Sequence, residues 1–291
     1  MSHPVRVRSA VAVAGAALLA LTACGTEEAS TTTAPTTSGG ALDCSLANLP
    51  LTEAGTLTIG TDSPAYEPYF QDDDPTNGKG FESAVAYAVA ENLGFTKDQV
   101  TWVVVPFNSS YAPGDKNFDF DINQISITPE RQQVVDFSDG YYAVQQAVVA
   151  IDGTPGADAT TIDDLKALKL GAQVGTTSLK YIQDVVQPMA EALVFDDTAA
   201  ATQALKLGNI DGLVVDLPTA FYITAVELDN GTIAGAFPAE QGGEQFGMLF
   251  QKGNGLVPCV NQALAQLKAQ GTLQAITDQY LGGQAGVPTF Q

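Results

Sequence analysis

The sequence predicts an α/β protein with two lobes. Its 291 residues, of which 45% are hydrophobic, can bury one large core or two medium ones. β-rich runs at 57–60 and 100–105 flank a segment at 81–93 whose apolar residues recur at helical spacing, and Gly94 suits the C-terminal cap of that helix. Strands that alternate with helices are typical of α/β folds. Two α/β lobes are therefore the expected architecture.

Residues 1–23 have the pattern of a secretory signal. Arg6 and Arg8 precede an apolar run at 10–21, and the string Leu-Thr-Ala-Cys at 21–24 resembles a lipobox. A transmembrane anchor is the alternative, but this run is short for a bilayer. No later stretch is long and apolar enough to cross a membrane, so we expect the rest of the chain to be exported.

Cleavage would leave Cys24 as the diacylated N-terminus of a lipoprotein that is anchored to a bacterial cell membrane. Residues 24–41 are rich in Ser, Thr, Ala and Gly, and they are predicted to form a flexible tether. The other two cysteines, Cys44 and Cys259, most simply pair in an oxidising extracytoplasmic compartment. Two buried thiols are the alternative. A disulfide would hold both ends of the folded chain in one lobe.

The mature chain is strongly acidic. Removing the signal takes away two of the 12 basic residues and none of the 33 acidic ones, which leaves a net charge of −23 and argues against nucleic acid as a partner. The sole histidine, His3, lies inside the signal, so His-dependent nucleophiles and His-ligated metals are excluded. The aspartates at 72–74 lack the spacing of an EF-hand loop. We expect no metal and no cofactor.

Residues 119–142 place polar side chains where an apolar strand is expected. Three isoleucines have the β-branched shape typical of strands, and Pro129 ends the run. The polar residues that interrupt it are Asn123, Gln124 and Ser126. Just beyond, Arg131 is the only arginine after the first few residues of the chain, and arginine is suited to a bidentate grip on a carboxylate. A surface ion pair with Glu130 or Asp136 is the alternative.

Two strings in this stretch, ISITPER and VVDFSDGYY, resemble the signature of the family 3 extracellular solute-binding proteins, the amino-acid receptors of ABC importers. The resemblance covers residues 50–283 in order. It implies a two-lobed periplasmic-binding-protein-like fold of type II, in which two crossover segments form the hinge. It also implies that Arg131 holds the α-carboxylate of the ligand. The side chains that line the same strand end would be Asn123, Gln124 and Ser126.

Three further strings resemble the same family. TDSPAYEPYF implies that Tyr66 stacks on the ligand with Asp62 nearby, and a core tyrosine is the alternative. LGAQVGTTS implies that Thr176 and Thr177 meet the ligand carboxylate opposite the arginine, although hydroxyls at such positions often cap a helix. LGNIDGLVVDLP implies that Asp216 takes the α-ammonium of the ligand, and helix capping is again the alternative.

The lobe boundaries follow from two expected crossings. The first lies in the apolar run at 143–151, and Gly242-Gly243 marks the return. The predicted boundaries are 42–147 and 243–291 for the first lobe and 148–242 for the second. One segment departs from the family, because relatives place a regular helix at 107–117 whereas Pro113-Gly114 predicts a broken one.

A free amino acid carries a cation and an anion on one carbon, and removing both from water is costly unless each meets an opposite charge. Arg131 and Asp216 would supply those charges from different lobes. We therefore expect a monomeric extracytoplasmic lipoprotein that closes around an amino acid and delivers it to the permease of an ABC importer. Asn123 and Gln124 replace small residues that are usual at these positions in the family, which indicates a polar ligand side chain.

Two alternatives stay open at this point. A sensory surface lipoprotein would bind a ligand but serve no permease, and its sequence would look the same. An enzyme on this fold, similar to relatives that dehydrate cyclohexadienyl acids, would need a general acid in the cleft. Without histidine, the candidates for that acid are Asp62, Asp121 and Asp216. Transport is the preferred prediction, and no catalytic residue is expected.

Overall fold

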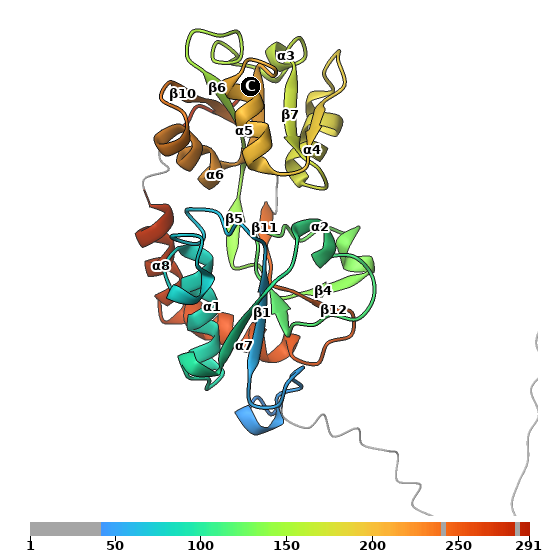
Figure 1. Cartoon of the computed structure of the whole chain (residues 1–291), viewed down its shortest axis with the longest axis vertical. Helices are drawn as coiled ribbons and strands as arrows, with labels where there is room; N and C mark the ends of the chain where they lie inside the picture. Colours follow the sequence, from blue (N-terminus) through green and yellow to red (C-terminus); the bar gives the residue numbers. More distant parts are fainter. Residues whose placement is uncertain (1–41, 240–242, 283–285) are drawn as a thin grey trace, which may run out of the picture. The chain divides into compact units, whose positions relative to one another are not determined.

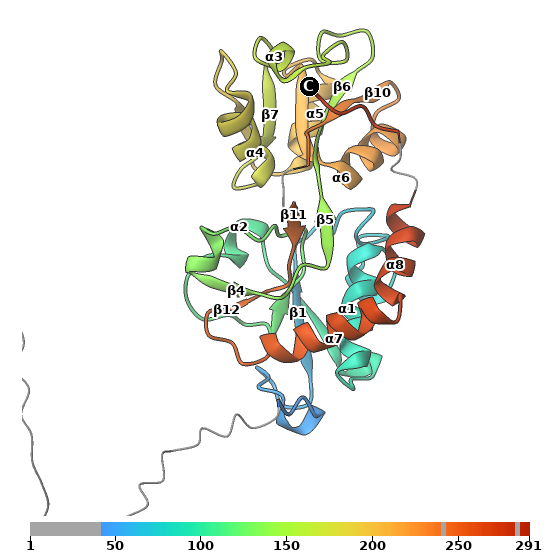
Figure 2. The same cartoon turned by 180° about the vertical axis from the view of Figure 1, so that it is seen from behind.

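The computed structural model describes residues 42–239, 243–282 and 286–291 (Figures 1 and 2). The predicted signal and the whole of the predicted tether at 24–41, including Cys24, lie outside these residues. The described chain contains two five-stranded sheets and one two-stranded sheet. Helices pack on each of the larger sheets, which gives two α/β lobes. No helix of the described residues combines the length and the apolar character that crossing a membrane requires.

The first lobe is built on a sheet with the strand order β2-β1-β3-β12-β4. These strands are β1 (Leu57–Thr61), β2 (Val100–Val104), β3 (Phe120–Asp121), β4 (Val135–Phe137) and β12 (Leu249–Gln251). β1 is parallel to β2 and β3, whereas β12 is antiparallel to β3 and β4. All of β1 is buried, as its central position requires. The carboxyl ends of β1 and β3 therefore meet at one edge of the sheet.

Three helices share the main core of the first lobe: α1 (Phe81–Asn92), α7 (Val257–Ala269) and α8 (Thr272–Leu281). The helical spacing in the sequence is confirmed, since Phe81 and Val85 are fully buried against β1. The predicted disulfide is also confirmed. Cys44 and Cys259 are bonded, with their Cα atoms 5.4 Å apart, so the start of the described chain is tied to α7. Short 3-10 turns occupy Leu46–Asn48, Pro75–Asn77, Lys97–Gln99 and Arg131–Gln133.

The second lobe is built on a sheet with the strand order β10-β6-β9-β7-β8. These strands are β6 (Gln146–Ile151), β7 (Leu170–Gln173), β8 (Leu193–Phe195), β9 (Gly212–Asp216) and β10 (Gly231–Ala236). Its helices are α3 (Ile162–Leu165), α4 (Thr177–Tyr181), α5 (Thr198–Lys206) and α6 (Leu217–Tyr222). π-Helical turns at Ile182–Val186 and Ile223–Glu227 extend α4 and α6. Separate apolar clusters pack on this sheet, so the second lobe has its own core.

The hinge is a two-stranded antiparallel sheet of β5 (Tyr142–Val144) and β11 (Glu244–Phe246), which runs between the two larger sheets (Figures 1 and 2). The chain enters the second lobe directly after β5, because Gln146 and Ala147 already pair with β9. The predicted boundary, which placed both residues in the first lobe, is wrong at this edge. The run at 143–151 is apolar apart from two adjacent glutamines, and this composition does not say at which residue the strand changes sheets.

The assignment of the whole of 243–291 to the first lobe is wrong for the last six residues. Thr289 bridges to Ala236 of β10, and the ring of Phe290 is buried against Phe237 at a centroid distance of 5.4 Å. Gly235 leaves the room for this ring, because a Cβ there would lie 2.9 Å from it. The end of the chain therefore packs in the core of the second lobe. A lone apolar residue near a terminus gave no signal of this contact.

Candidate functional site

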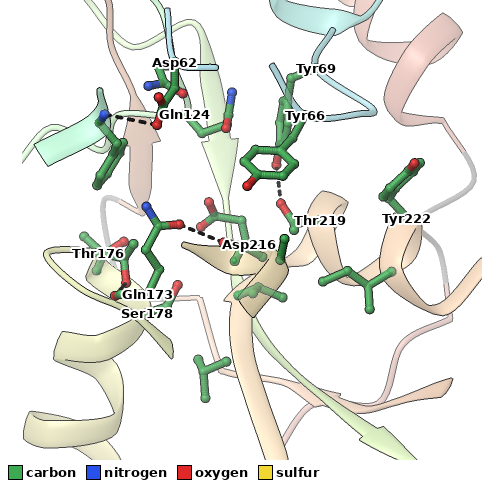
Figure 3. Close-up of a pocket in the computed structure, with 18 of the residues that line it drawn as sticks. Asp62, Tyr66, Tyr69, Gln124, Gln173, Thr176, Ser178, Asp216, Thr219 and Tyr222 are labelled. Carbon is green, nitrogen blue, oxygen red and sulfur yellow. Dashed lines mark hydrogen bonds between the residues drawn. The ribbon is translucent and has the colours of Figure 1, made fainter. Parts of the chain in front are cut away.

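A cleft of about 820 Å³, part of it open to solvent, is lined by residues of both lobes (Figure 3). All nine residues that the sequence predicts to bind a ligand line it: Asp62, Tyr66, Asn123, Gln124, Ser126, Arg131, Thr176, Thr177 and Asp216. The first six come from the carboxyl-end edge of the first sheet, and the last three follow β7 or end β9. The lobes touch across the cleft, where the hydroxyls of Tyr69 and Thr219 lie 3.1 Å apart.

Arg131 is a buried arginine that bridges the two lobes. Only 8% of its surface is exposed. Its Nη1 donates to the carbonyl oxygen of Ser126 at 2.7 Å, and its Nη2 donates to the carbonyl oxygen of Gly175, in the second lobe, at 2.9 Å. No acidic side chain of the described residues forms an ion pair with it, and Asp136 instead pairs with Lys252 at 2.8 Å. The alternative of a surface ion pair is therefore wrong.

Two aromatic rings hold the guanidinium of Arg131. Its central carbon lies 5.5 Å from the ring centre of Phe107 and 4.8 Å from that of Tyr111. Both rings belong to the segment around α2 (Phe107–Ser110), a single helical turn, as the Pro113-Gly114 pair predicts. Burial lowers the pKa of Arg131, but a guanidinium stays charged at neutral pH. The site thus contains a permanent cation, and most of the N–H groups of its guanidinium are still able to donate hydrogen bonds to a ligand.

Asp216 is a partly buried acid on the opposite lobe. It ends β9 and directly precedes α6, yet its side chain makes no capping hydrogen bond to that helix, so the helix-capping alternative is wrong. One carboxylate oxygen accepts a hydrogen bond from Nε2 of Gln146 at 2.6 Å. Burial, and next the charge of Glu244, raise the pKa of Asp216 well above its ordinary value. A cation placed beside this carboxyl would favour its ionised form.

The hydroxyls of the loop after β7 have divided roles. Thr176 caps α4, since its Oγ1 accepts from the backbone N–H of Leu179 at 3.1 Å and donates to the carbonyl oxygen of Gln173 at 2.7 Å. Its side chain therefore does what the capping alternative proposes. Thr177 lies closer to the first lobe, with its Oγ1 3.5 Å from Oγ of Ser126. Of the two predicted threonines, Thr176 thus caps a helix, whereas Thr177 lies near the first lobe.

Asp62 and Tyr66 follow β1 on the other side of the cleft (Figure 3). The carboxylate of Asp62 accepts from the backbone N–H groups of Ser63 at 2.7 Å and Phe107 at 3.1 Å, so it ties two loops of the first lobe together. The side chain of Tyr66 is partly buried, and it is not among the core residues of the lobe. Burial, and then the charges of Asp197, Asp62 and Glu227, raise the pKa of Tyr66 to about 12.

Comparison with known proteins agrees with this geometry. Residues 57–283 match the sequence description of the bacterial extracellular solute-binding proteins, family 3. The chain belongs to this family. The family resemblance in the sequence is confirmed, and with it the two-lobed type II fold.

Relatives of this family 3 protein differ in the ligands that their names state. The L-cystine-binding protein TcyJ of Escherichia coli K12 is 32% identical over 235 residues, which cover 79% of this chain and 84% of that protein. The L-arginine-binding protein of Pseudomonas aeruginosa is 29% identical over 257 residues, covering 83% and 94%. A solved ancestral arginine-binding protein bound to glutamine has a TM-score of 0.67 and 30% identity, covering 79% and 99%. All three are named as binding proteins and none as an enzyme.

The two amides of the polar strand end are placed differently in this solute-binding protein. Asn123 is 5% exposed, and its Nδ2 has no hydrogen-bond partner among the described residues. Gln124 instead adopts a left-handed backbone with φ of 48°. Its backbone N–H donates to buried Glu82 at 2.7 Å, and its side-chain amide nitrogen also donates to that carboxylate. Of the two amides, that of Asn123 therefore has a donor without a partner among the described residues.

Three groups next to the site escaped the sequence reasoning: Gln146 and Glu82, which are buried, and Glu244, which is partly buried. Gln146 donates through Nε2 to Asp216 and also to Glu244, the latter at 3.1 Å. Glu244, on the hinge strand β11, accepts from Oγ of Ser126 at 2.5 Å. Two adjacent glutamines in the apolar run at 143–151 were a signal for the first of these. Glu82 sits at a buried helical position that ordinarily holds an apolar side chain.

Asp121 lies outside the cleft. It is fully buried, neither of its carboxylate oxygens has a hydrogen-bond partner among the described residues, and it does not line the cleft. Burial raises its pKa well above the ordinary value of 3.8, and the charges of Glu82 and Asp62 raise it further. Its position removes Asp121 from the residues that were considered as a general acid.

The lining of the cleft has an excess of negative charge. Its acidic members are Asp62, Glu67, Asp216 and Glu227, and its single basic member among the described residues is Arg131. A zwitterion that pairs with Arg131 and Asp216 would leave three carboxylates without a cation. Glu227 is half-buried, and burial raises its pKa, as expected for an acid that lacks a positive neighbour.

Proposed function

We propose that this protein captures an amino acid between its lobes outside the cytoplasm and delivers it to an ABC-type importer. The observation that carries the proposal is the placement of Arg131 and Asp216. These two oppositely charged side chains, Arg131 buried and Asp216 partly buried, come from different lobes, line one cleft and lack an ion-pair partner among the described residues. A zwitterion satisfies both charges at once, and it joins the two lobes in doing so.

In this proposal the α-carboxylate of the ligand accepts hydrogen bonds from Arg131 and from the loop at Thr176 and Thr177. Its α-ammonium donates to Asp216 and to Oγ of Ser126. The side chain of the ligand lies against the ring of Tyr66, which is partly exposed to the cleft. The unpartnered Nδ2 of Asn123 supplies a donor to an acceptor on the bound amino acid.

The ligand side chain is proposed to be polar and positively charged. After Arg131 and Asp216 are matched, the acids Asp62, Glu67 and Glu227 remain in the lining, and a guanidinium or ammonium group would relieve their mutual repulsion. Arginine fits this balance. Cystine has no net charge and presents a second carboxylate, for which the described lining offers no second cation.

The N-terminal segment completes the proposal. The lipobox pattern supports cleavage before Cys24, lipidation of that residue and anchoring of a monomer to the outer face of the cell membrane through the tether. Membrane contact would be by the lipid alone. The partner would be the permease subunits of the importer. Neither sensing without a permease nor cyclohexadienyl dehydration is favoured by an observation here, and Asp121 is buried away from the cleft.

Thermal unfolding of the purified protein with each common L-amino acid, L-ornithine and L-cystine tests this function. L-Arginine should raise the unfolding temperature most, because binding to the native state alone stabilises it by mass action. Isothermal titration calorimetry would then give the affinity, and mass spectrometry would identify any amino acid that co-purifies. The proposal is wrong if no amino acid in the panel binds. Stronger binding of cystine or a neutral amino acid would overturn only the assignment of a cationic side chain.

A further inference from the structure

The segment that departs from the family pattern forms a direct contact between the lobes. Tyr111 follows α2 in the first lobe, and its hydroxyl donates to Oδ1 of Asn108 at 2.6 Å. The same hydroxyl lies 3.4 Å from the carbonyl oxygen of Gly175, which belongs to the loop between β7 and α4 in the second lobe. Burial raises the pKa of Tyr111, so the hydroxyl keeps its proton and remains a donor at neutral pH.

The carbonyl oxygen of Gly175 is also where Arg131 reaches the second lobe. Nη2 of Arg131 donates to it at 2.9 Å, while the guanidinium packs on the ring of Tyr111 at 4.8 Å. The arginine, the tyrosine and the carbonyl therefore form one connected set. Stacking on an aromatic face restrains the plane of a guanidinium, so the ring of Tyr111, together with that of Phe107, restrains the direction in which the arginine fork points.

The fit at Gly175 depends on the absence of a side chain. A Cβ at this position would lie 2.3 Å from Oδ1 of Asn108 and 2.3 Å from the hydroxyl oxygen of Tyr111, distances at which one side must move. The backbone φ of Gly175 is +74°, a conformation that glycine adopts without strain. The two lobes are thus in close contact here, and a larger residue would force either the side-chain ends of Asn108 and Tyr111 or the lobes themselves to move.

We propose that Tyr111 is a positioning residue that couples the carboxylate-binding arginine to closure of the lobes. It orients Arg131 by stacking, and with Asn108 it forms a latch against Gly175 that exists only when the lobes are closed. The identity of the ligand rests on the proposed function, but the latch itself does not. Because a bound ligand can leave only after this contact has broken, its loss should speed dissociation and leave association nearly unchanged.

Rate measurements with L-arginine, L-cystine and L-glutamine as probes test the coupling. Tyr111→Phe keeps the ring and removes the hydroxyl, so the dissociation rate should rise about 3-fold. Tyr111→Leu also removes the stacking, and a rise of about 10-fold or more is expected. Tyr87→Phe is the matched control, because Tyr87 donates its hydroxyl to Thr76 within the first lobe, outside the cleft. A merely structural role would lower the unfolding temperature without this split between the two rates.

Small-angle X-ray scattering tests the latch without a ligand. Gly175→Ala should give a larger radius of gyration than the unmodified protein, because the new methyl group holds the lobes apart. Gly208→Ala is the control, since Gly208 has a similar φ of +72° and no atom lies within 4 Å of the place that a methyl group would take there, so it should match the unmodified protein. Equal radii for Gly175→Ala and Gly208→Ala would overturn the latch. If no probe binds the unmodified protein, the proposed function fails while the scattering result still decides the latch.

Discussion

Replacing Arg131 with alanine should abolish useful amino-acid binding. The side chain is 8% exposed, and no acid of the described residues pairs with it, so its charge is free for an incoming carboxylate. A buried carboxylate that loses its partner costs about 3–5 kcal/mol, which weakens binding about 150- to 5000-fold. Arg131→Lys keeps the charge but loses the fork and the stacking on two rings. We expect about a tenfold loss for that variant.

Isothermal titration calorimetry with L-arginine measures these changes. Lys206→Ala is the control, because it removes the same charge from an exposed position at the end of α5, outside the cleft. Thermal unfolding must accompany the titration, since Arg131→Ala also leaves the carbonyl oxygens of Ser126 and Gly175 without their donor. Affinity within threefold of the unmodified protein in a folded Arg131→Ala variant would refute the assignment of the carboxylate partner.

Three further outcomes are expected. Burial and the charge of Glu244 raise the pKa of Asp216, and a bound ammonium would lower it. Binding should therefore release a proton from Asp216 and tighten as the pH rises from the ordinary range of an aspartate through this raised pKa. Calorimetry in buffers of different ionisation enthalpy detects the released proton, and Asp216→Asn should abolish the release. Burial raises the pKa of Glu82 from 4.5 to about 7. The contribution of Glu82 to the free energy of unfolding is therefore fully present below pH ~4.5 and declines by about 3 kcal/mol as pH rises to ~7. Glu82→Gln should remove this pH dependence from the unfolding free energies given by denaturant curves, and an unchanged pH dependence would contradict the prediction. Cys44→Ser removes a disulfide between residues 215 apart in the sequence, so the free energy of unfolding should fall by about 2–5 kcal/mol. An unchanged free energy of unfolding would mean that the disulfide does not stabilise the native state.

The positions of Glu82 and Asp216 explain why stability and binding should respond to pH in opposite directions. Among the residues that the structure describes, the hydrogen-bond donors to Glu82 are Gln124 and Tyr141 of its own lobe, so ionisation of Glu82 affects folding. Asp216 faces the cleft, where a ligand cation would offset the cost that burial adds to its ionisation. Raising the pH therefore ionises Glu82, which destabilises the native state, and it ionises Asp216, which favours binding of a ligand cation.

Much of the site was readable from the sequence because its residues stand at the ends of recognisable strands. Polar residues in place of an apolar strand, followed by a single arginine, marked one wall, and Asp216 after a buried strand marked the other. All nine predicted residues line one cleft, although their contacts with a ligand stay a prediction. The disulfide was readable as well, since only two cysteines follow the lipobox.

The sequence by itself determined the fold, the family and the residue types at the strand ends, because hydrophobic periodicity and local motifs are properties of neighbouring residues. Tertiary structure alone decided which side chains share a partner. Gln146 and Glu244, nearly a hundred residues apart, are joined by a hydrogen bond, and Phe290 packs in the second lobe rather than the first. The contact of Tyr111 with Gly175 likewise depends on how one lobe rests on the other. Such pairings arise from packing in three dimensions, which no local pattern in the chain encodes.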